Sequence, residues 1–90
     1  MNNDRRKELR TLEERIGSLR SELETLRDEI DTIKGDEEAY FEAMPESLQG
    51  SERGTNSQAA SDALQEAYDE LDNAVTSLET TVEKLGEAAA

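Results

Sequence analysis

The sequence predicts an all-α protein: an antiparallel helical hairpin of the coiled-coil type, assembling into a homodimeric four-helix bundle or a higher oligomer. Two unbroken heptad patterns and a single central proline lead to this prediction. Only 33% of the 90 residues are hydrophobic and 3% are aromatic, too few for a thick globular core. A chain of this size gains its stability from regular helix packing or from oligomerisation. We therefore expect a single domain spanning residues 1–90.

The first predicted helix covers about residues 4–43. An asparagine or aspartate within residues 2–4 can cap its start. From Leu9 to Ile33 the large apolar residues alternate at spacings of 3 and 4. This period of 3.5 residues is typical of a narrow coiled-coil seam. Gly35 falls at an outward position, where glycine costs about 1 kcal/mol without ending a helix; a break there is the alternative.

A connector is predicted at residues 44–56. Pro45 ends the first helix because its ring disfavours helical backbone at the preceding residue. Residues 45–50 are expected to form one helical turn with proline first and glycine after the last position. Residues 51–57 are polar and are expected to form a loop in which Gly54 is free to take a positive φ.

The second predicted helix covers about residues 57–87. Its large apolar residues also alternate at spacings of 4 and 3 without a gap, and alanines form a row of small side chains beside them. So wide an apolar face favours more than two packed helices. The predicted seam, which serves the oligomer as well, is Leu9, Leu12, Ile16, Leu19, Leu23, Leu26, Ile30, Ile33, Leu64, Tyr68, Leu71, Val75, Leu78, Val82 and Leu85, and the alanines are Ala60, Ala67, Ala74 and Ala88.

The short connector favours an antiparallel pair, because it makes the second helix turn back along the first. Charges at the e positions of the two seams agree with this direction. They predict the pairs Arg27 with Glu79 and Lys34 with Asp72, each worth about 0.2–1 kcal/mol on an exposed surface.

The net charge of −13 is distributed unevenly along the sequence. Residues 1–34 hold eight basic and nine acidic residues, whereas residues 35–90 hold two basic and fourteen acidic ones. This excess disfavours direct binding to nucleic acid or to an anionic membrane, and a basic protein surface is its natural complement. The predicted partner-binding acidic face is Asp62, Glu66, Asp69, Glu70, Asp72, Glu79 and Glu83.

The residue types argue against enzymatic activity. The chain has no histidine and no cysteine, and no glycine-rich phosphate loop follows a strand. We therefore expect no catalytic residue, no metal and no cofactor. Glu37 is the one carboxylate at an inward position, and we interpret it as a polar residue that sets the helix register. No apolar run approaches the roughly 18 residues of a membrane span, so a soluble, cytoplasmic protein is expected.

The connector offers a different class of site. Hydrogen-bonding side chains gather there beside a helix N-terminus, a place where a small anion or a nucleotide can bind. The alternative is a capped hairpin tip in which Arg53 pairs with Glu46 or Glu52. The residues of this possible ligand site are Gln49, Ser51, Arg53, Thr55 and Asn56.

Residues 37–54, Glu-Glu-Ala-Tyr-Phe-Glu-Ala-Met-Pro-Glu-Ser-Leu-Gln-Gly-Ser-Glu-Arg-Gly, resemble a known connector. It belongs to a family of small, acidic, largely uncharacterised bacteriophage and prophage proteins with the pattern Pro-Glu-x-Leu-Gln-x-Ser-x-Arg between two charged helices. The resemblance covers nearly the whole chain, although only the connector is distinctive. It implies a phage accessory protein in the cytoplasm of an infected or lysogenic bacterium, and it carries over no catalytic residue.

These observations lead to one functional hypothesis and two alternatives. The hypothesis is a non-enzymatic protein whose acidic helical surface binds and inhibits a basic, nucleic-acid-binding host protein, as a DNA mimic or anti-defence factor. The first alternative is an oligomer that sequesters a small ligand such as a nucleotide through the connector. The second is a structural adaptor in phage assembly.

Overall fold

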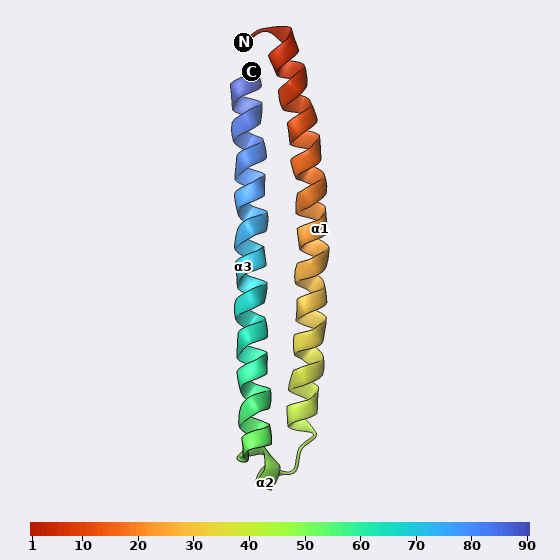
Figure 1. Cartoon of the computed structure of the whole chain (residues 1–90), viewed down its shortest axis with the longest axis vertical. Helices are drawn as coiled ribbons and strands as arrows, with labels where there is room; N and C mark the ends of the chain where they lie inside the picture. Colours follow the sequence, from red (N-terminus) through yellow and green to blue (C-terminus); the bar gives the residue numbers. More distant parts are fainter.

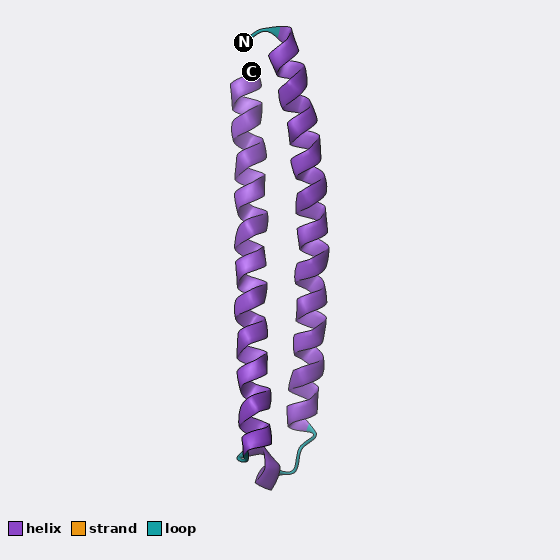
Figure 2. Ribbon diagram, in the orientation of Figure 1, coloured by secondary structure: helices purple, strands orange, loops and turns teal.

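The computed structural model describes all residues, 1–90, and is all-helical, as predicted. It contains α1 (Asn3–Glu42), α2 (Glu46–Gln49) and α3 (Glu52–Ala89). The long helices α1 and α3 run in opposite directions side by side, with both termini at one end and α2 at the other (Figures 1 and 2). The resulting rod measures 69 × 14 × 13 Å. None of its helices combines the length and the apolar character that crossing a membrane requires.

Helix α1 begins and ends close to the predicted positions. The Asn2 side chain accepts a hydrogen bond from the backbone N–H of Arg5 at 2.8 Å, so Asn2 is the N-cap. The helix continues without interruption through Gly35, and the alternative break there is wrong. It ends at Glu42, ahead of Pro45, and the chain then buries Met44 to 9% exposure.

Helix α3 begins at Glu52, so the predicted loop before residue 57 is wrong. Ser51 has extended backbone and is the N-cap, and the Thr55 N–H donates to the Ser51 carbonyl at 2.9 Å. Gly54 lies inside the helix, and no residue of the chain has a positive φ. A Cβ at Gly54 would lie only 2.6 Å from the Gln49 Cα. Glycine is required there because α2 crosses α3 at close range.

Helix α3 presents one continuous seam to α1. Every third and fourth residue from Gly54 to Ala89 is buried or half-buried, and Val75 is the most buried apolar one at 5% exposure. The seam therefore begins with the small residues Gly54, Ser57 and Ser61 before the predicted apolar series starts at Leu64. These small side chains leave room for the bulky end of α1, where Phe41 is half-buried.

Helix α1 faces α3 with different rows from those that the sequence predicts. Two of its rows are half-buried: the a row, Leu9, Ile16, Leu23, Ile30 and Glu37, and the e row, Arg6, Glu13, Arg20, Arg27, Lys34 and Phe41. The buried Met44 continues the a row beyond the end of the helix. Its d row lies outside the interface: Leu12, Leu19, Leu26, Ile33 and Tyr40 are 41%, 54%, 43%, 56% and 49% exposed. We call these five residues the apolar stripe. Because fully burying such a side chain is worth about 1.5–3 kcal/mol, about 1 kcal/mol per residue remains available to a further contact.

The predicted ion pairs between the helices are wrong by one heptad. Arg27 pairs with Asp72 rather than Glu79, and Lys34 pairs with Glu38 of its own helix at 3.0 Å. The earlier start of α3 and the compact turn at α2 move the two helices past each other by seven residues. Exposed ion pairs are worth too little to oppose this shift.

Candidate functional site

The folded chain concentrates its negative charge in one half of the rod. Arg27 and Asp72 lie at the same level, so residues 28–72 form the half that ends at α2, which we call the tip half. It contains fourteen acidic and two basic residues, a net charge of −12. The terminal half, residues 1–27 and 73–90, contains nine acidic and eight basic residues, a net charge of −1. In the folded chain, the difference in net charge between the two parts of the sequence therefore becomes a difference in net charge between the two ends of the rod.

All seven residues of the predicted acidic face are exposed. Six of them occupy the adjacent heptad positions b, e and f of α3 and share one side of the helix; Glu70, at position c, lies on the opposite flank. The rod also divides the set lengthwise, with Asp62, Glu66, Asp69 and Asp72 in the tip half and Glu79 and Glu83 in the terminal half. The structure therefore places five of the seven predicted residues in the strongly acidic tip half, four of them on one side and Glu70 on the other.

The carboxylates of the acidic face are largely unpaired. Asp72 is the only member with a basic partner within 4.0 Å. Asp69 accepts a hydrogen bond from Gln65 Nε2 at 2.9 Å, which leaves its charge uncompensated. The face therefore presents free negative charge to solvent.

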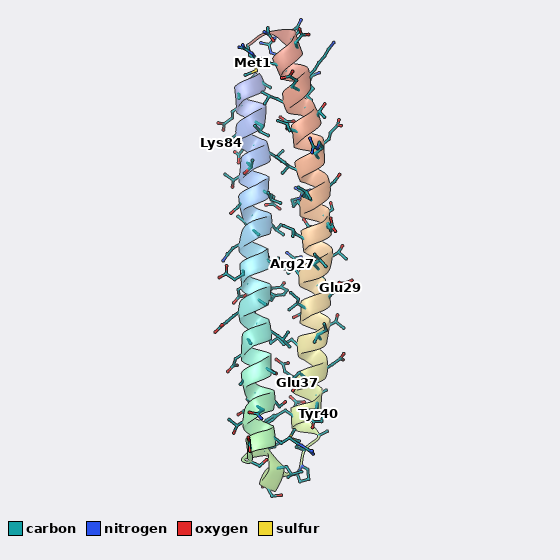
Figure 3. All side chains as sticks on the ribbon, in the orientation of Figure 1. Met1, Arg27, Glu29, Glu37, Tyr40 and Lys84 are labelled. Atoms are coloured by element: carbon teal, nitrogen blue, oxygen red, sulfur yellow. The ribbon has the colours of Figure 1, made fainter.

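The Arg27 side chain of α1 reaches towards α3, between the two long helices (Figure 3). Its guanidinium lies 3.1 Å from Asp28 Oδ1, 2.9 Å from Asp72 Oδ1 and 5.7 Å from the centre of the Tyr68 ring. Hydrogen bonds from Arg27 to Asp28 and then to Asp72 raise the pKa of Arg27 further above its ordinary value, against the opposing effect of burial. Arg27 is thus a fixed positive charge that uses one carboxylate of the acidic face to hold the helices together.

A groove on the same side deepens the acidic region near the tip. It has a volume of about 380 Å³ and is lined by Glu38, Phe41, Glu42, Gln58, Ser61 and Asp62. Three carboxylates around one aromatic ring suit the head and the aliphatic stem of a lysine or an arginine. No group of three or more potential metal ligands is placed to hold a metal ion.

The predicted ligand site in the connector is dispersed by the helical start of α3. Gln49 Nε2 donates to the Phe41 carbonyl at 3.2 Å, and the Ser51 hydroxyl donates to the Leu48 carbonyl. These two side chains therefore stabilise the turn. Thr55 is exposed, as are Arg53 and Asn56.

Arg53 and Asn56 line a second groove, on the other side of the rod. It has a volume of about 440 Å³ and is completed by Glu37, Tyr40, Glu52 and Ser57. Its two carboxylates outnumber its single arginine, which opposes the binding of an anion. Arg53 has no carboxylate within 4.0 Å, so the predicted pairing with Glu46 or Glu52 does not form.

Ser57 is a residue whose position sequence reasoning missed. It is 3% exposed, and its hydroxyl oxygen has no hydrogen-bond partner. The signal was present in the heptad pattern, since Ser57 lies seven residues before Leu64 of the seam.

No family model matches the chain, and no similar protein is found among curated proteins or solved structures.

Proposed function

We propose that the chain is a non-enzymatic interaction protein, in which the tip half of an acidic helical hairpin binds a basic surface of another protein. The observation that carries this proposal is the net charge of −12 on residues 28–72, most of it on exposed and unpaired carboxylates. Such a field attracts a basic partner at long range and speeds its association.

The density of this charge favours a partner that binds nucleic acid. The tip half is about 35 Å long, half of the 69 Å rod, and so carries roughly one net negative charge per 3 Å. A single nucleic-acid strand carries one charge per 3.4 Å and a duplex one per 1.7 Å. A narrow rod with this spacing fits a cleft that is built for a nucleic-acid backbone, and its binding there inhibits the partner by excluding the natural ligand.

The groove between Glu42 and Asp62 provides a specific contact within this general attraction. Long-range charge governs the encounter, whereas the Phe41 ring and its surrounding carboxylates provide a place for one basic side chain of the partner. Inhibition of a host defence or replication protein is the form of this function that fits the phage resemblance of the connector.

The test compares two triple variants with the same net charge. In the tip variant Asp62→Asn, Glu66→Gln and Asp69→Asn remove three free carboxylates from the tip half. In the control variant Glu14→Gln, Glu79→Gln and Glu83→Gln remove three exposed, unpaired carboxylates from the terminal half. Immobilised parent and variants are incubated with bacterial lysate at low salt, washed at high salt, and the released proteins are identified by mass spectrometry.

The expected result is a nucleic-acid-binding protein that the parent and the control variant retain and the tip variant loses. The purified partner should release a fluorescent DNA or RNA probe when the parent chain is added. Equal retention by both variants, or a partner that keeps its probe, would contradict the proposal.

A further inference from the structure

We propose that a second copy of this chain binds over the apolar stripe, reversed end to end, and completes a four-helix bundle. The two copies meet on the side of the rod opposite the Arg27–Asp72 ion pair. This inference is independent of the proposed function, because it rests on the apolar stripe and on the side of the rod opposite the groove between Glu42 and Asp62.

The first observation is the shape of the exposed apolar surface. Five of the seven exposed large hydrophobic residues form the stripe, each seven residues from the next. Between Leu12 and Tyr40 this row extends about 42 Å at 1.5 Å per residue. Meanwhile Met44 and Val75 are the only buried hydrophobic residues. Each residue of the stripe therefore keeps 41–56% of its surface exposed in the single chain.

The second observation is that the alanine row of α3 lies on the same face. In antiparallel helices that pack through their seams, the e flanks lie together and the opposite flanks lie together. Arg27 and Asp72, both at e, mark one side of the rod. The stripe and the alanine row, at position g, must share the other. Tyr40 and Arg53 agree with this placement, because they line one groove and Arg53 lies seven residues before Ala60.

The third observation is the exposed area of the chain. A compact monomer of 10.0 kDa exposes about 5,200 Å². This chain exposes 6382 Å². The excess of about 1,100 Å² is comparable to the ~800 Å² that each partner buries in a standard-size interface.

Charge decides the direction of the second copy. Two copies in the same direction would place one tip half of charge −12 directly beside another. Reversed copies place each tip half beside a terminal half of charge −1, whose residues 1–27 hold seven of the ten basic residues. Self-repulsion within the dimer is therefore far smaller in the reversed arrangement.

The apolar stripe of α1 and the alanine row of α3 also have their midpoints at the same level of the rod, which a reversed two-fold dimer requires. When one copy is turned end to end and laid face to face on the other, α1 lies over α1 and α3 over α3, each antiparallel. Leu26 is the middle of the stripe and Ala74 is the middle of the heptad row from Ala60 to Ala88. The Arg27–Asp72 ion pair places Leu26 and Ala74 at nearly the same level. One two-fold axis can therefore pass through both rows, with the alanines allowing the α3 helices to approach closely.

The mass in solution tests the existence of the dimer. Light scattering after size-exclusion chromatography should give twice the 10.0 kDa chain mass. The substitutions Leu19→Glu and Ile33→Glu together should shift the protein to the monomer. The control is Leu48→Glu, which alters a leucine that is 40% exposed in α2 outside the stripe, and it should stay dimeric. A parent chain that is monomeric at every concentration, or a control that dissociates as readily as the stripe variant, would overturn the proposal.

A distance measurement tests the relative direction of the two copies without altering the apolar stripe. It therefore tests the proposed dimer even if the stripe variant fails to fold. The chain has no cysteine, so Ser47→Cys in α2 places a single spin label at the tip. Reversed copies should give a distance between the two labels close to the 69 Å length of the rod. Copies in the same direction would give roughly 20 Å or less, since neighbouring helix axes lie 8–10 Å apart, and that result would refute the reversed arrangement.

Discussion

Arg27 Nη1 donates to Asp72 Oδ1 at 2.9 Å and links α1 to α3 at the boundary between the tip half and the terminal half. The Arg27 side chain is 21% exposed and the Asp72 side chain 52% exposed. This ion pair and the neighbouring Tyr68 ring lie where the two long helices meet at the middle of the rod, in a register that packing along the seams determines.

Removal of Arg27 should destabilise the fold more than removal of its partner's charge. Arg27→Ala loses three contributions: the ion pair, the cation–π contact and the packing of its aliphatic stem. Asp72→Asn loses only the ion pair, about 0.5 kcal/mol. Urea unfolding followed by circular dichroism measures both. Arg10→Ala, at an exposed residue without an ion pair, is the control and should change the free energy of unfolding by less than about 0.5 kcal/mol.

The contribution of Arg27 should not vary with pH between about 5 and 9. Its pKa is raised in the folded chain, so the stabilisation is complete below the unfolded pKa of Arg27 and is lost only as pH rises through the still higher folded value. Both values lie above this range. The difference in free energy of unfolding between the parent and Arg27→Ala should therefore stay constant across it, and a steady decline towards pH 9 would contradict the assignment.

Two glycine substitutions should have opposite effects. Gly54→Ala should destabilise the chain by about 1–3 kcal/mol, because the new Cβ overlaps the backbone of Gln49. Gly35→Ala should stabilise it by about 0.5–1 kcal/mol, because a Cβ there meets nothing within 4 Å and alanine favours the helix. Thermal unfolding monitored by circular dichroism compares the two. A stabilised Gly54→Ala variant would mean that α2 does not pack against α3.

Glu37→Leu should stabilise the helix pair by about 1 kcal/mol. Glu37 occupies the a row, half-buried beside the seam of α3, where a leucine extends the apolar contact. Denaturant titration gives the change. Asp31→Leu, at an exposed residue with no ion pair, is the matched control and should have little effect. A destabilised Glu37→Leu variant would instead assign Glu37 a positive role in setting the register.

Salt should stabilise the fold. Fourteen carboxylates within the tip half repel one another, and raising the ionic strength from about 0.01 M to about 0.15 M shortens the screening length from ~30 Å to ~8 Å. We expect a gain on the order of 1 kcal/mol in the free energy of unfolding. The tip variant, with three of these carboxylates neutralised, should gain less than the control variant. Destabilisation by salt would show that the five ion pairs outweigh this repulsion.

The sequence predicted the long helices well where one local signal dominates. The apolar period of 3.5, the Asn2 cap and Pro45 each act within a few residues, and α1 begins and ends close to the expected positions. The start of α3 was missed because residues 51–56 are polar and include Gly54, which resembles a loop by composition. Packing against α2 and the a row of α1 decides the structure there, and intrinsic propensity is a weak guide against such contacts.

The choice of rows on α1 was harder to predict for a different reason. Charged residues at e are read as solvent-facing, yet Arg20, Arg27 and Lys34 are half-buried in the structure. Their aliphatic stems cover the apolar seam of α3 while their charged heads reach the edge of the interface. A pattern that classes each residue as either apolar or polar counts the whole arginine as polar, although its methylene stem can pack against apolar residues. The acidic face was simpler to place, because exposed carboxylates follow from helix periodicity alone.

Helix α3 is joined to α1 through the chain only at the tip (Figure 1), and at the opposite end a single hydrogen bond, from Arg6 Nε to the Ala89 carbonyl at 3.0 Å, links the two helices. Contacts between the long helices are lateral, so the two helices can separate progressively from the end that holds both termini. Contacts nearer the tip stay intact while this happens. At the closed end, α2 and the buried residues Met44, Gly54 and Ser57 hold the helices together. A pulling force or a protease therefore acts first on the terminal half, and the most acidic part of the chain is the last to lose its shape.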